Sequence, residues 1–365
     1  MIPQIDSEEK QDYISNIKEI NNITKELKHV LKEVENTFNS MMLLIPSVPL
    51  ENVPVGIDDS ENVLLYEIGT VKDLSETPLD HIILGEKHNV FDLEKSSDVS
   101  GSRMYYLKHN GFLLQRAIEN LVLDVLMQNG FSFMDVPVMV KEDAMIKTGY
   151  FPNGKEEAYE ITKDNLYLVG SSEVPLISYY SNKKLNEEDL PIKVSAISTC
   201  FRREAGSYGR DTRGAYRVHQ FNKIEQIVIC KDNKEADIEM HKLLLQNAEN
   251  ILKKLELPYR VVEVCTGDMG QGQVKKHDIE VWMPSRGKYG ETHSCSSFFD
   301  FQARRADIKY RALDGSVKFA YTLNNTAVAF PRILIPFLEN HQTTDGEIKI
   351  PLALQQYLGG KKYLS

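Results

Sequence analysis

The chain has 365 residues and carries 43 Lys and Arg against 53 Asp and Glu, a formal net charge of −10 at pH 7. At about 150 residues per domain, this length predicts two to three domains at most. It is also long enough to bury a substantial hydrophobic core. A hydrophobic share of 42% excludes wholesale disorder. The acidic balance argues against a general nucleic-acid binder, although a local basic patch is compatible with it.

Targeting signals and cysteines set the expected compartment. No apolar run approaches the roughly 18 residues of a spanning helix, and the first residues lack a signal-peptide core. The four cysteines lie 30 to 35 residues apart, at positions 200, 230, 265 and 295, without a Cys-x-x-Cys pair. This spacing favours reduced thiols, and we expect a cytoplasmic protein.

The first predicted element is a long helix at residues 8–42, which contain no Pro or Gly. Its apolar positions advance in alternating steps of four and three: Tyr13, Ile17, Ile20, Thr24, Leu27, Leu31, Val34, Phe38 and Met41. This heptad seam fits an amphipathic helix lying on its own domain, or a helix with a partner. We expect the seam to be covered by the body of the protein, by a second copy, or by another protein.

Two further parts follow the helix. Pro46, Pro49 and Pro54 end it, and residues 46–100 read as a loop-rich connector with one strand at 63–68. Beyond it we expect helices at 112–128 and 234–255, and short strands near 134–140, 166–169, 194–199, 224–229, 260–264 and 279–283. Strands with helices between them and no regular βαβ spacing predict an α+β fold with a largely antiparallel sheet. The predicted parts are therefore 1–45, 46–100 and 101–365.

The segment 201–226 is rich in arginine and glycine and reads as a strand, a polar loop and a returning strand. Arginine on a strand suits phosphate binding, because its guanidinium group bonds two oxygens at once. A solvated charged hairpin is the alternative. The arginines concerned are Arg202, Arg203, Arg210, Arg213 and Arg217, with Gly206, Gly209 and Gly214 between them.

A second cluster, GETHSCSS, occupies residues 290–297. Glu291 and Ser294 offer oxygen ligands suited to Mg²⁺. Three residues apart, they face opposite ways on a regular strand, so one shared metal requires a bulge or turn between them. His293 and Cys295 raise zinc as an alternative, but two ligands do not make a zinc site. No zinc is expected, and both residues are interpreted as packing or hydrogen-bonding groups.

A third cluster, YTLNNTAVAFPR, occupies residues 321–332 and passes into an apolar run. We interpret Asn324, Asn325 and Thr326 as a polar turn before a helix, where helix capping is the simplest role for the hydroxyl. Arg332 lies in otherwise apolar surroundings, and an arginine in such a place usually pairs with an anion.

These clusters, in this order, resemble the class II aminoacyl-tRNA synthetases, and among them the seryl-tRNA synthetases. The resemblance extends from about Asn36 to Tyr357 and rests on VSGSRMYYLK, SSEVPL, FRREAG, GRDTRGAYRVHQF, CTGDMG, IEVWMP, SCSS, DFQARR, TLNN and ILIPFLEN. It implies an antiparallel sheet flanked by helices and preceded by one long N-terminal helix. It also implies a homodimer with the region 120–137 at its interface, and ATP- and Mg²⁺-dependent activation of L-serine followed by transfer to tRNA(Ser).

The resemblance also implies residue roles at the nucleotide. Arg202 matches the arginine that grips the α-phosphate, and Phe221 matches the aromatic beneath the adenine ring. Arg332 would lie above that ring, and Glu291 and Ser294 match the Mg²⁺ and ATP ligands. The implied ATP site is Arg202, Arg203, Glu204, Val218, Phe221, Glu291, Ser294 and Arg332, of which Arg202, Glu291 and Arg332 are the catalytic residues.

For the amino acid, the resemblance implies that Glu173 pairs with the serine ammonium and that Glu225 and Thr326 receive the hydroxyl. Ser171, Ser172 and Arg202 complete the implied serine site. The family usually has Pro-Thr-Ala-Glu where this chain has Gly170-Ser171-Ser172-Glu173. Because Ser171 and Thr326 keep hydroxyl groups, we expect serine to be bound, with a similar small amino acid as the alternative.

The N-terminus departs most from the family, in which two antiparallel helices form a tRNA-binding arm. Here Met1 falls where the second helix should begin, and residues 8–35 carry five lysines against seven acids. Polyanion binding depends on Lys and Arg, so we expect weak tRNA binding through this helix. Transfer of serine to a carrier protein or a small-molecule amine is therefore an alternative. A non-catalytic regulator is a further one, disfavoured because the motif residues are all present.

Overall fold

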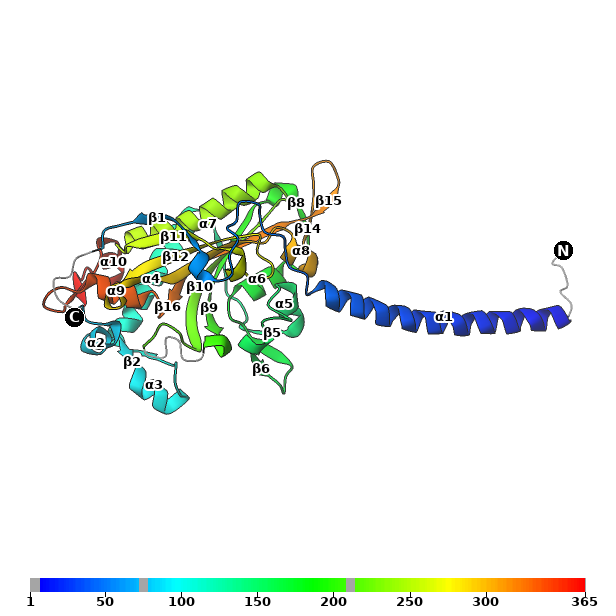
Figure 1. Ribbon diagram of the computed structural model, residues 1–365, viewed down its shortest axis with the longest axis horizontal. Coiled ribbons are helices and arrows are strands. Elements are labelled where there is room, and N and C mark those ends of the chain that lie inside the picture. Colours follow the sequence, from blue (N-terminus) through cyan, green and yellow to red (C-terminus); the bar gives the residue numbers. More distant parts are fainter. Residues whose placement is uncertain (1–6, 72–77, 208–213, 365) are drawn as a thin grey trace. The chain divides into compact units, whose positions relative to one another are not determined.

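The computed structural model describes residues 7–71, 78–207 and 214–364, with side chains from residue 9 onward in the first helix (Figure 1). The chain divides into two compact units, Met1–Ile45 and Pro46–Ser365. Residues 46–100, expected as a separate connector, thus belong to the same unit as the rest of the body.

The first unit is one helix, α1 (Ser7–Met42), so the prediction of a continuous helix over 8–42 is confirmed. Its seam from Tyr13 to Met41 forms an apolar stripe, as a 3.5-residue repeat requires. No other described element belongs to this unit, so nothing within the unit covers the stripe. Which surface covers it stays a prediction.

The body is built on an eight-stranded sheet with the order β1-β11-β12-β13-β16-β10-β9-β4. Neighbouring strands are antiparallel except β4 and β9, which run parallel. The predicted α+β fold with a largely antiparallel sheet is confirmed. The strands are β1 (Val63–Ile68), β4 (Ser132–Met134), β9 (Ile192–Phe201), β10 (Gln220–Cys230), β11 (Tyr259–Glu263), β12 (Lys275–Met283), β13 (Lys288–Ser297) and β16 (Tyr321–Phe330).

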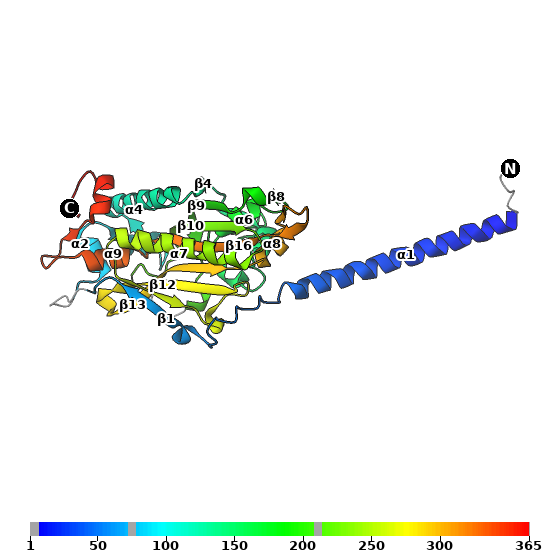
Figure 2. The same ribbon diagram turned by 90° about the horizontal axis from the view of Figure 1, so that it is seen from above.

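Two long helices, α4 (His109–Gln128) and α7 (Lys234–Lys254), pack on one face of this sheet, as Figure 2 shows. The strand β10 shows how the sequence divides between the two faces. Ile224 and Val228 join the core under these helices, whereas Ile227 and Ile229 join the core on the opposite face. This alternation with period two leaves Glu225 on the face away from α4 and α7, where the candidate site lies.

The opposite face carries α6 (Glu173–Tyr179) and α8 (Phe301–Ala306), which share a core with β9 and β10. The helix α5 (Glu142–Lys147) lies against both. Two small sheets complete this side. One contains β5 (Met139–Lys141), β6 (Tyr159–Ile161) and β7 (Leu166–Leu168), and the other β8 (Lys184–Asn186), β14 (Lys309–Arg311) and β15 (Val317–Phe319).

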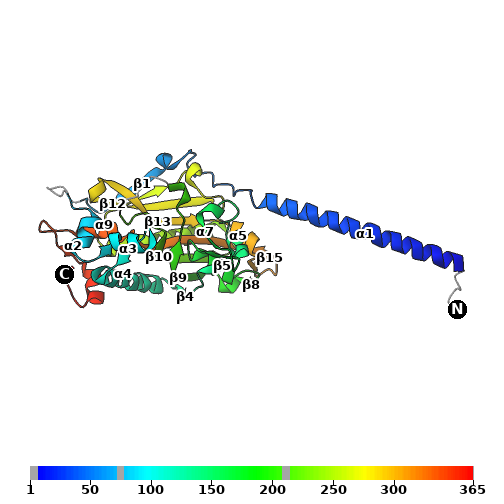
Figure 3. The same ribbon diagram turned by 90° about the horizontal axis from the view of Figure 1, so that it is seen from below.

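The region expected to be loop-rich is more structured than predicted. It contains α2 (His81–Lys87), β2 (Phe91–Asp92) and α3 (Leu93–Ser100), and β1, predicted at 63–68, is confirmed as an edge strand on β11. The helix α2 begins at the cap Asp80, whose carboxylate accepts from Ile82 N and Ile83 N. It contacts α9 (Leu334–His341), beside which it lies in Figure 3.

Two local predictions are wrong. The stretch 134–140 is two strands in different sheets, β4 and β5, because Pro137 interrupts the strand between them. The segment around Asn324–Thr326 is not a turn before a helix. It lies within β16, in the middle of the sheet, where Asn324 and Thr326 point to one face and the Asn325 amide donates to Leu244 O of α7 on the other.

The remaining described elements are short: β3 (Tyr106–Leu107), β17 (Ile348–Lys349), β18 (Tyr363–Leu364) and α10 (Leu352–Gln355). All four cysteines are buried and free of disulfides, as expected. Among the helices of the described residues, none has the length and apolar character to span a bilayer.

Candidate active site

A cavity of about 390 Å³ opens on the face of the sheet away from α4 and α7. Side chains from β10, β13 and β16 form its floor, and α6 and the residues around α8 close one end. Ten of the predicted site residues line it: Glu173, Arg202, Glu204, Val218, Phe221, Glu225, Glu291, Ser294, Thr326 and Arg332. Residues that lie up to 159 positions apart in the sequence therefore share one cavity.

The strands β9 and β10 bring the arginine-rich segment to this cavity. The two predicted strands are confirmed, since Phe201 pairs with Gln220 across them. Residues 208–213 of the segment predicted as a loop lie outside the described residues. Arg202 N donates to His219 O over 2.9 Å, which continues the ladder by one step. The Arg202 guanidinium lies 5.2 Å from the ring centroid of Phe221, and its Nε donates to Gly170 O over 3.3 Å.

One end of the cavity contains the buried carboxylate of Glu173. Tyr150 Oη donates to it over 3.0 Å, and Gln302 Nε2 over 2.6 Å. Burial raises the pKa of the Glu173 carboxyl, and the neighbouring Glu225 raises it further, while the bond from Gln302 opposes the shift. Glu173 is thus held in position by two neutral donors.

A second carboxylate, Glu225, lies in the same end. It pairs with the ammonium of Lys223, which shares its strand and its face, and accepts from Ser171 Oγ over 2.9 Å. Its register partner across the sheet is Thr326 on β16, so the hydroxyl and the carboxylate are cross-strand neighbours. This end therefore offers two acidic groups and one hydroxyl within a small volume.

The other end of the cavity is cationic. Arg332 follows β16, and its Nη1 lies 3.7 Å from Glu291 Oε2. Its Nε donates to Tyr216 O over 3.4 Å, and its guanidinium lies 4.6 Å from the centroid of the Tyr216 ring. Glu204, with a left-handed backbone at φ 55°, forms an ion pair with Arg217 at 3.3 Å. Arg202 and Lys276 also act on Glu291, so four cations surround the two carboxylates of this end and leave it with net positive charge.

Glu291 and Ser294 face the same cavity because β13 contains a bulge. Ile279 pairs with His293 and Glu280 pairs with Glu291, which leaves Thr292 as the extra residue. The bulge that the spacing required is confirmed. Burial acts to raise the pKa of Glu291, but Arg332, Lys276 and Arg202 outweigh it and lower this pKa, so Glu291 stays a carboxylate. Nearby, burial raises the pKa of Asp278 to about 7 against the opposing charge of Lys276.

Three predicted residues lie outside the lining of the cavity. Ser171 touches its lining through Glu225, to which its Oγ donates, and through Glu173 N, which donates to the same Oγ over 3.2 Å. Ser172 is fully buried, with its Oγ 3.5 Å from Ala196 O. Arg203 is exposed and borders a different hollow beside Tyr159 and Tyr167. Gly209, Arg210, Asp211 and Arg213 lie outside the described residues.

His293 and Cys295 have the packing and hydrogen-bonding roles that were expected. His293 is buried, its Nδ1 lies 2.7 Å from Thr292 Oγ1 and its Nε2 lies 3.1 Å from Ala327 O. Burial lowers the pKa of His293 to about 4, so the ring is neutral at pH 7. Within residues 7–71, 78–207 and 214–364, no three His, Cys, Asp or Glu side chains are grouped as metal ligands.

The comparisons with known proteins agree with this geometry. The family of class II tRNA synthetase core domains (G, H, P, S and T) matches residues 157–341. The serine--tRNA ligase of Deinococcus radiodurans is 43% identical over 364 residues, covering 100% of this chain and 86% of the relative. The chain belongs to the seryl-tRNA synthetase family. The serine--tRNA ligase of Pseudothermotoga lettingae is 40% identical, covering 98% of this chain and 85% of the relative.

Solved structures show the same fold. The seryl-tRNA synthetase from Pyrococcus horikoshii, complexed with ATP, superposes with a TM-score of 0.91 at 35% identity, over 96% of this chain and 83% of that one. The resemblance to class II seryl-tRNA synthetases inferred from the motifs is therefore confirmed, as is the class II fold.

Several residues of this synthetase cavity were not singled out in the sequence: Tyr150, Tyr216, Lys223, Lys276 and Gln302. Lys223 had a usable signal, because it lies two residues before Glu225 on a predicted strand and so shares its face. Tyr150 and Gln302 had none, since their contact with Glu173 joins segments 23 and 129 residues apart.

Proposed function

We propose that this member of the seryl-tRNA synthetase family activates L-serine with ATP and transfers the seryl group to tRNA(Ser), using the cavity described above. One observation carries the proposal. The cavity joins a cationic end, with Arg202 and Arg332, to an acidic end, with Glu173 and Glu225. A phosphate chain fits the first end and an amino acid with an ammonium group fits the second.

In the acidic end, Glu173 pairs with the serine ammonium, and Glu225 and Thr326 receive the serine hydroxyl. Lys223 and Ser171 orient Glu225 by an ion pair and a hydrogen bond to the same carboxylate oxygen, Oε2. An alanine in this place leaves these buried groups without their partner. Sites of this kind reject the analogue that lacks the hydroxyl by about 10⁴-fold or more.

In the cationic end, Arg202 binds the α-phosphate, while Phe221 supports the adenine ring. Arg332 lies above that ring and reaches the γ-phosphate, and Glu204 and Val218 border the adenine. Because a guanidinium bonds two phosphate oxygens at once, two arginines suffice to orient the triphosphate. Arg203, which is exposed, is left out of this proposed set.

The first step is an in-line displacement at the α-phosphorus. A serine carboxylate oxygen forms the new bond to phosphorus, and the bond between the α-phosphorus and the bridging oxygen breaks, so that pyrophosphate leaves with the electron pair. No general base is needed, because the attacking carboxylate is already ionised. Arg202 stabilises the charge that develops on the phosphoryl oxygens, and positioning supplies the remainder.

The second step transfers the seryl group. The terminal ribose hydroxyl of tRNA attacks the carbonyl carbon of the adenylate, AMP leaves with the electron pair of the broken acyl–oxygen bond, and the hydroxyl proton is lost to solvent. The named relatives are serine--tRNA ligases, which supports this acceptor. No observation favours a carrier protein or a small-molecule amine. ATP and tRNA as reactants also support a cytoplasmic location.

Magnesium fits the residues present. Glu291 and Ser294 supply a carboxylate and a hydroxyl from the same side of the bulged strand, and the lowered pKa of Glu291 keeps it ionised. Bound there, Mg²⁺ would neutralise charge on the departing pyrophosphate. Arg332, 3.7 Å from Glu291, holds that carboxylate toward the cavity.

A homodimer is part of the proposal, with region 120–137 at its interface. Met127 and Phe133 in this region are 60% and 38% exposed. Apolar side chains exposed together favour association. Light scattering on the purified protein tests this, and a monomer at micromolar concentration would contradict it.

ATP–pyrophosphate exchange tests the first step, and aminoacylation of tRNA tests the second. We expect exchange that depends on L-serine and Mg²⁺, and no exchange with L-alanine. If none of the standard amino acids supports exchange, the enzymatic proposal fails. Seryl-adenylate offered in parallel to tRNA, carrier protein and small amines then identifies the acceptor.

A further inference from the structure

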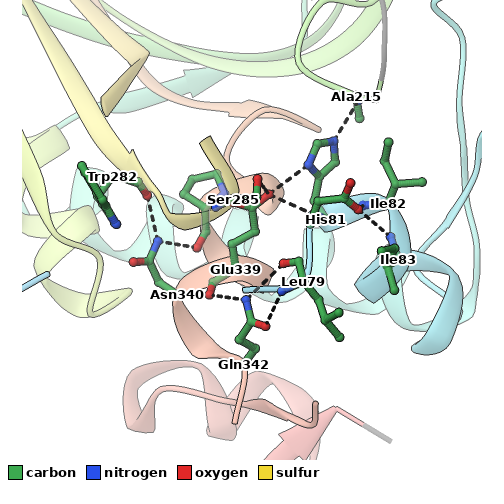
Figure 4. Close-up of polar contacts among 12 residues, drawn as sticks. Leu79, His81, Ile82, Ile83, Ala215, Trp282, Ser285, Glu339, Asn340 and Gln342 are labelled. Atoms are coloured by element: carbon green, nitrogen blue, oxygen red, sulfur yellow. Dashed lines mark hydrogen bonds and ion pairs between the residues drawn. The ribbon is translucent and has the colours of Figure 1, made fainter. Parts of the chain in front are cut away.

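A polar network outside the cavity links α2, α9 and the segment after residue 213 (Figure 4). Its centre is Glu339 in α9, whose side chain is fully buried. This carboxylate accepts from His81 N over 3.0 Å, Ser285 N over 3.0 Å and Ser285 Oγ over 2.9 Å. His81 Nδ1 lies 3.0 Å from it as well. A buried carboxylate with this many donors is a fixed point in the fold.

The two ring nitrogens of His81 have different roles. Glu339 offers only acceptor oxygens, so Nδ1 carries the proton and donates. Nε2 lies 3.3 Å from Ala215 N, a backbone donor, and therefore accepts. His81 is 5% exposed, so water does not replace either partner. The geometry thus selects the neutral imidazole with its proton on Nδ1.

Gly214 is required for this contact. A Cβ atom at this position would lie 2.3 Å from His81 Nε2, and the backbone has φ 86°, which favours glycine. The imidazole therefore approaches the chain closely at the first described residues after 213. It fixes the backbone at the point where the chain returns to the cavity.

Tyr216, the residue after Ala215, lines the cavity and contacts Arg332 and the main chain of Glu291. Its Oη donates to Glu291 O over 3.0 Å, and its carbonyl accepts from Arg332 Nε over 3.4 Å. The Arg332 guanidinium lies 4.6 Å from its ring centroid. A shift of Ala215 is thereby transmitted to Glu291 and Arg332 through one peptide unit.

We propose that His81 is a positioning residue for ATP. It links the buried Glu339 carboxylate to the backbone at Ala215, and it thereby fixes the positions of Tyr216, Arg332 and Glu291. This proposal rests on the ATP site proposed above. His81 is not among the residues that line the cavity. Within the described part of the chain, the hydrogen bonds of Glu173 and Glu225 at the serine end do not involve this network.

A neighbouring contact provides a matched control. Gln342, at the end of α9, accepts from Leu79 N over 3.0 Å and donates to Leu79 O over 3.2 Å. It holds the same segment to the same helix two residues from His81, but it does not reach Ala215. Its Nε2 also donates to the main-chain oxygen of Glu339 over 2.9 Å, not to the carboxylate that holds His81. Gln342→Met removes all three hydrogen bonds and keeps the volume.

The test compares His81→Asn, His81→Gln and Gln342→Met in the full chain. Asparagine keeps a donor for Glu339 but cannot reach Ala215, whereas glutamine places an acceptor near the position of Nε2. We expect His81→Asn to raise the KM for ATP by about tenfold, the effect of one lost buried hydrogen bond, without changing the KM for serine. His81→Gln should recover most of this loss, and Gln342→Met should lower Tm but leave the KM for ATP unchanged.

An unchanged KM for ATP in His81→Asn overturns the proposal, and so does an equal rise in Gln342→Met. If His81→Asn does not fold, Gly214→Ala displaces the same contact from the backbone side. An unchanged affinity of Gly214→Ala for ATP would also overturn the proposal. Calorimetric Kd values for ATP give the same comparison without catalysis. Absence of serine-dependent exchange in the unmodified protein would contradict the proposed function, but the Kd values for ATP would still test the role of His81.

Discussion

The two ends of the cavity hold their charges in different ways. At the acidic end, Glu173 and Glu225 have short contacts to protein partners, including 2.6 Å from Gln302 and 2.9 Å from Ser171. At the cationic end, Arg202 and Arg332 have long ones, 3.3 Å to Gly170 O and 3.7 Å to the Glu291 carboxylate. The carboxylates of the acidic end thus already have close hydrogen-bond partners within the protein. The arginines of the cationic end have only long contacts and can form shorter bonds to a ligand.

This difference fits the two tasks. Discrimination between serine and alanine depends on acceptors that cannot move to compensate for a missing hydroxyl, so that end is rigid. Stabilisation of a phosphoryl transition state depends on charge that engages most strongly as the reaction proceeds, so that end keeps its arginines weakly paired. The following changes test this contrast, from the largest expected effect to the smallest.

Arg202→Ala should lower serine-dependent exchange by about 10² to 10³-fold, because a preorganised cation at the α-phosphate is lost. Exchange kinetics measure the effect, and circular dichroism checks the fold. Arg203→Ala is the matched control, since its neighbouring side chain is exposed outside the cavity. Equal losses in both variants would show that general positive charge, and not the position of Arg202, binds the phosphate.

Glu225→Gln should reduce kcat/KM for serine by about 100-fold, because the variant replaces the charged hydroxyl acceptor by a neutral amide and leaves Lys223 buried without its ion pair. The KM for ATP should change little, since the nucleotide contacts lie at the other end. Thr326→Val, which keeps the shape and removes only a hydroxyl, should cost about tenfold. A rise in the KM for ATP with either variant would contradict the separation of the two ends.

The pH dependence of serine binding should follow Glu173, whose pKa is raised. A raised pKa means that this carboxyl takes up its proton at a higher pH than an ordinary glutamate, and the protonated form cannot pair with an ammonium group. Serine affinity is therefore full above that pKa and falls by up to about tenfold per pH unit below it. ATP affinity should hold over the same range, because the pKa of Glu291 is lowered.

Measurements of both KM values between pH 5 and 8 check this contrast. In Glu173→Gln, serine binding should be weak at every pH, and the fall in serine affinity on acidification should disappear. A parallel loss of serine and ATP affinity on acidification would point to unfolding instead of a local protonation.

Ser294→Ala should have the smallest effect, a rise of a few fold in the Mg²⁺ concentration that supports half-maximal exchange, because one neutral ligand of a hydrated ion is lost. Titration of exchange with Mg²⁺ measures it. Ser297→Ala, whose hydroxyl instead bonds to Asp237 away from the cavity, is the control. A shifted Mg²⁺ requirement in the control alone would contradict the assignment.

Much of this site could be predicted from local patterns. The spacing of Glu291 and Ser294 required a bulge, and β13 has one at Thr292. The alternation along β10 places Phe221, Lys223 and Glu225 on one face, because side chains repeat every two residues in a strand. The heptad steps from Tyr13 to Met41 likewise determine a continuous helix. Each of these features depends on neighbours within a few positions, which the order of residues encodes directly.

Other features were decided only by the tertiary structure. Arg202 and Arg203 are adjacent in an extended segment, so alternation puts them on opposite sides, but only the packing of the sheet determined that the cavity lies on the side of Arg202. Thr326 appeared to belong to a turn and proved to lie in a central strand, where its partner is Glu225. The bond from His81 to Glu339 joins residues 258 positions apart. No spacing rule reaches that far, because such a pair is brought together only when the whole sheet and its helices have packed.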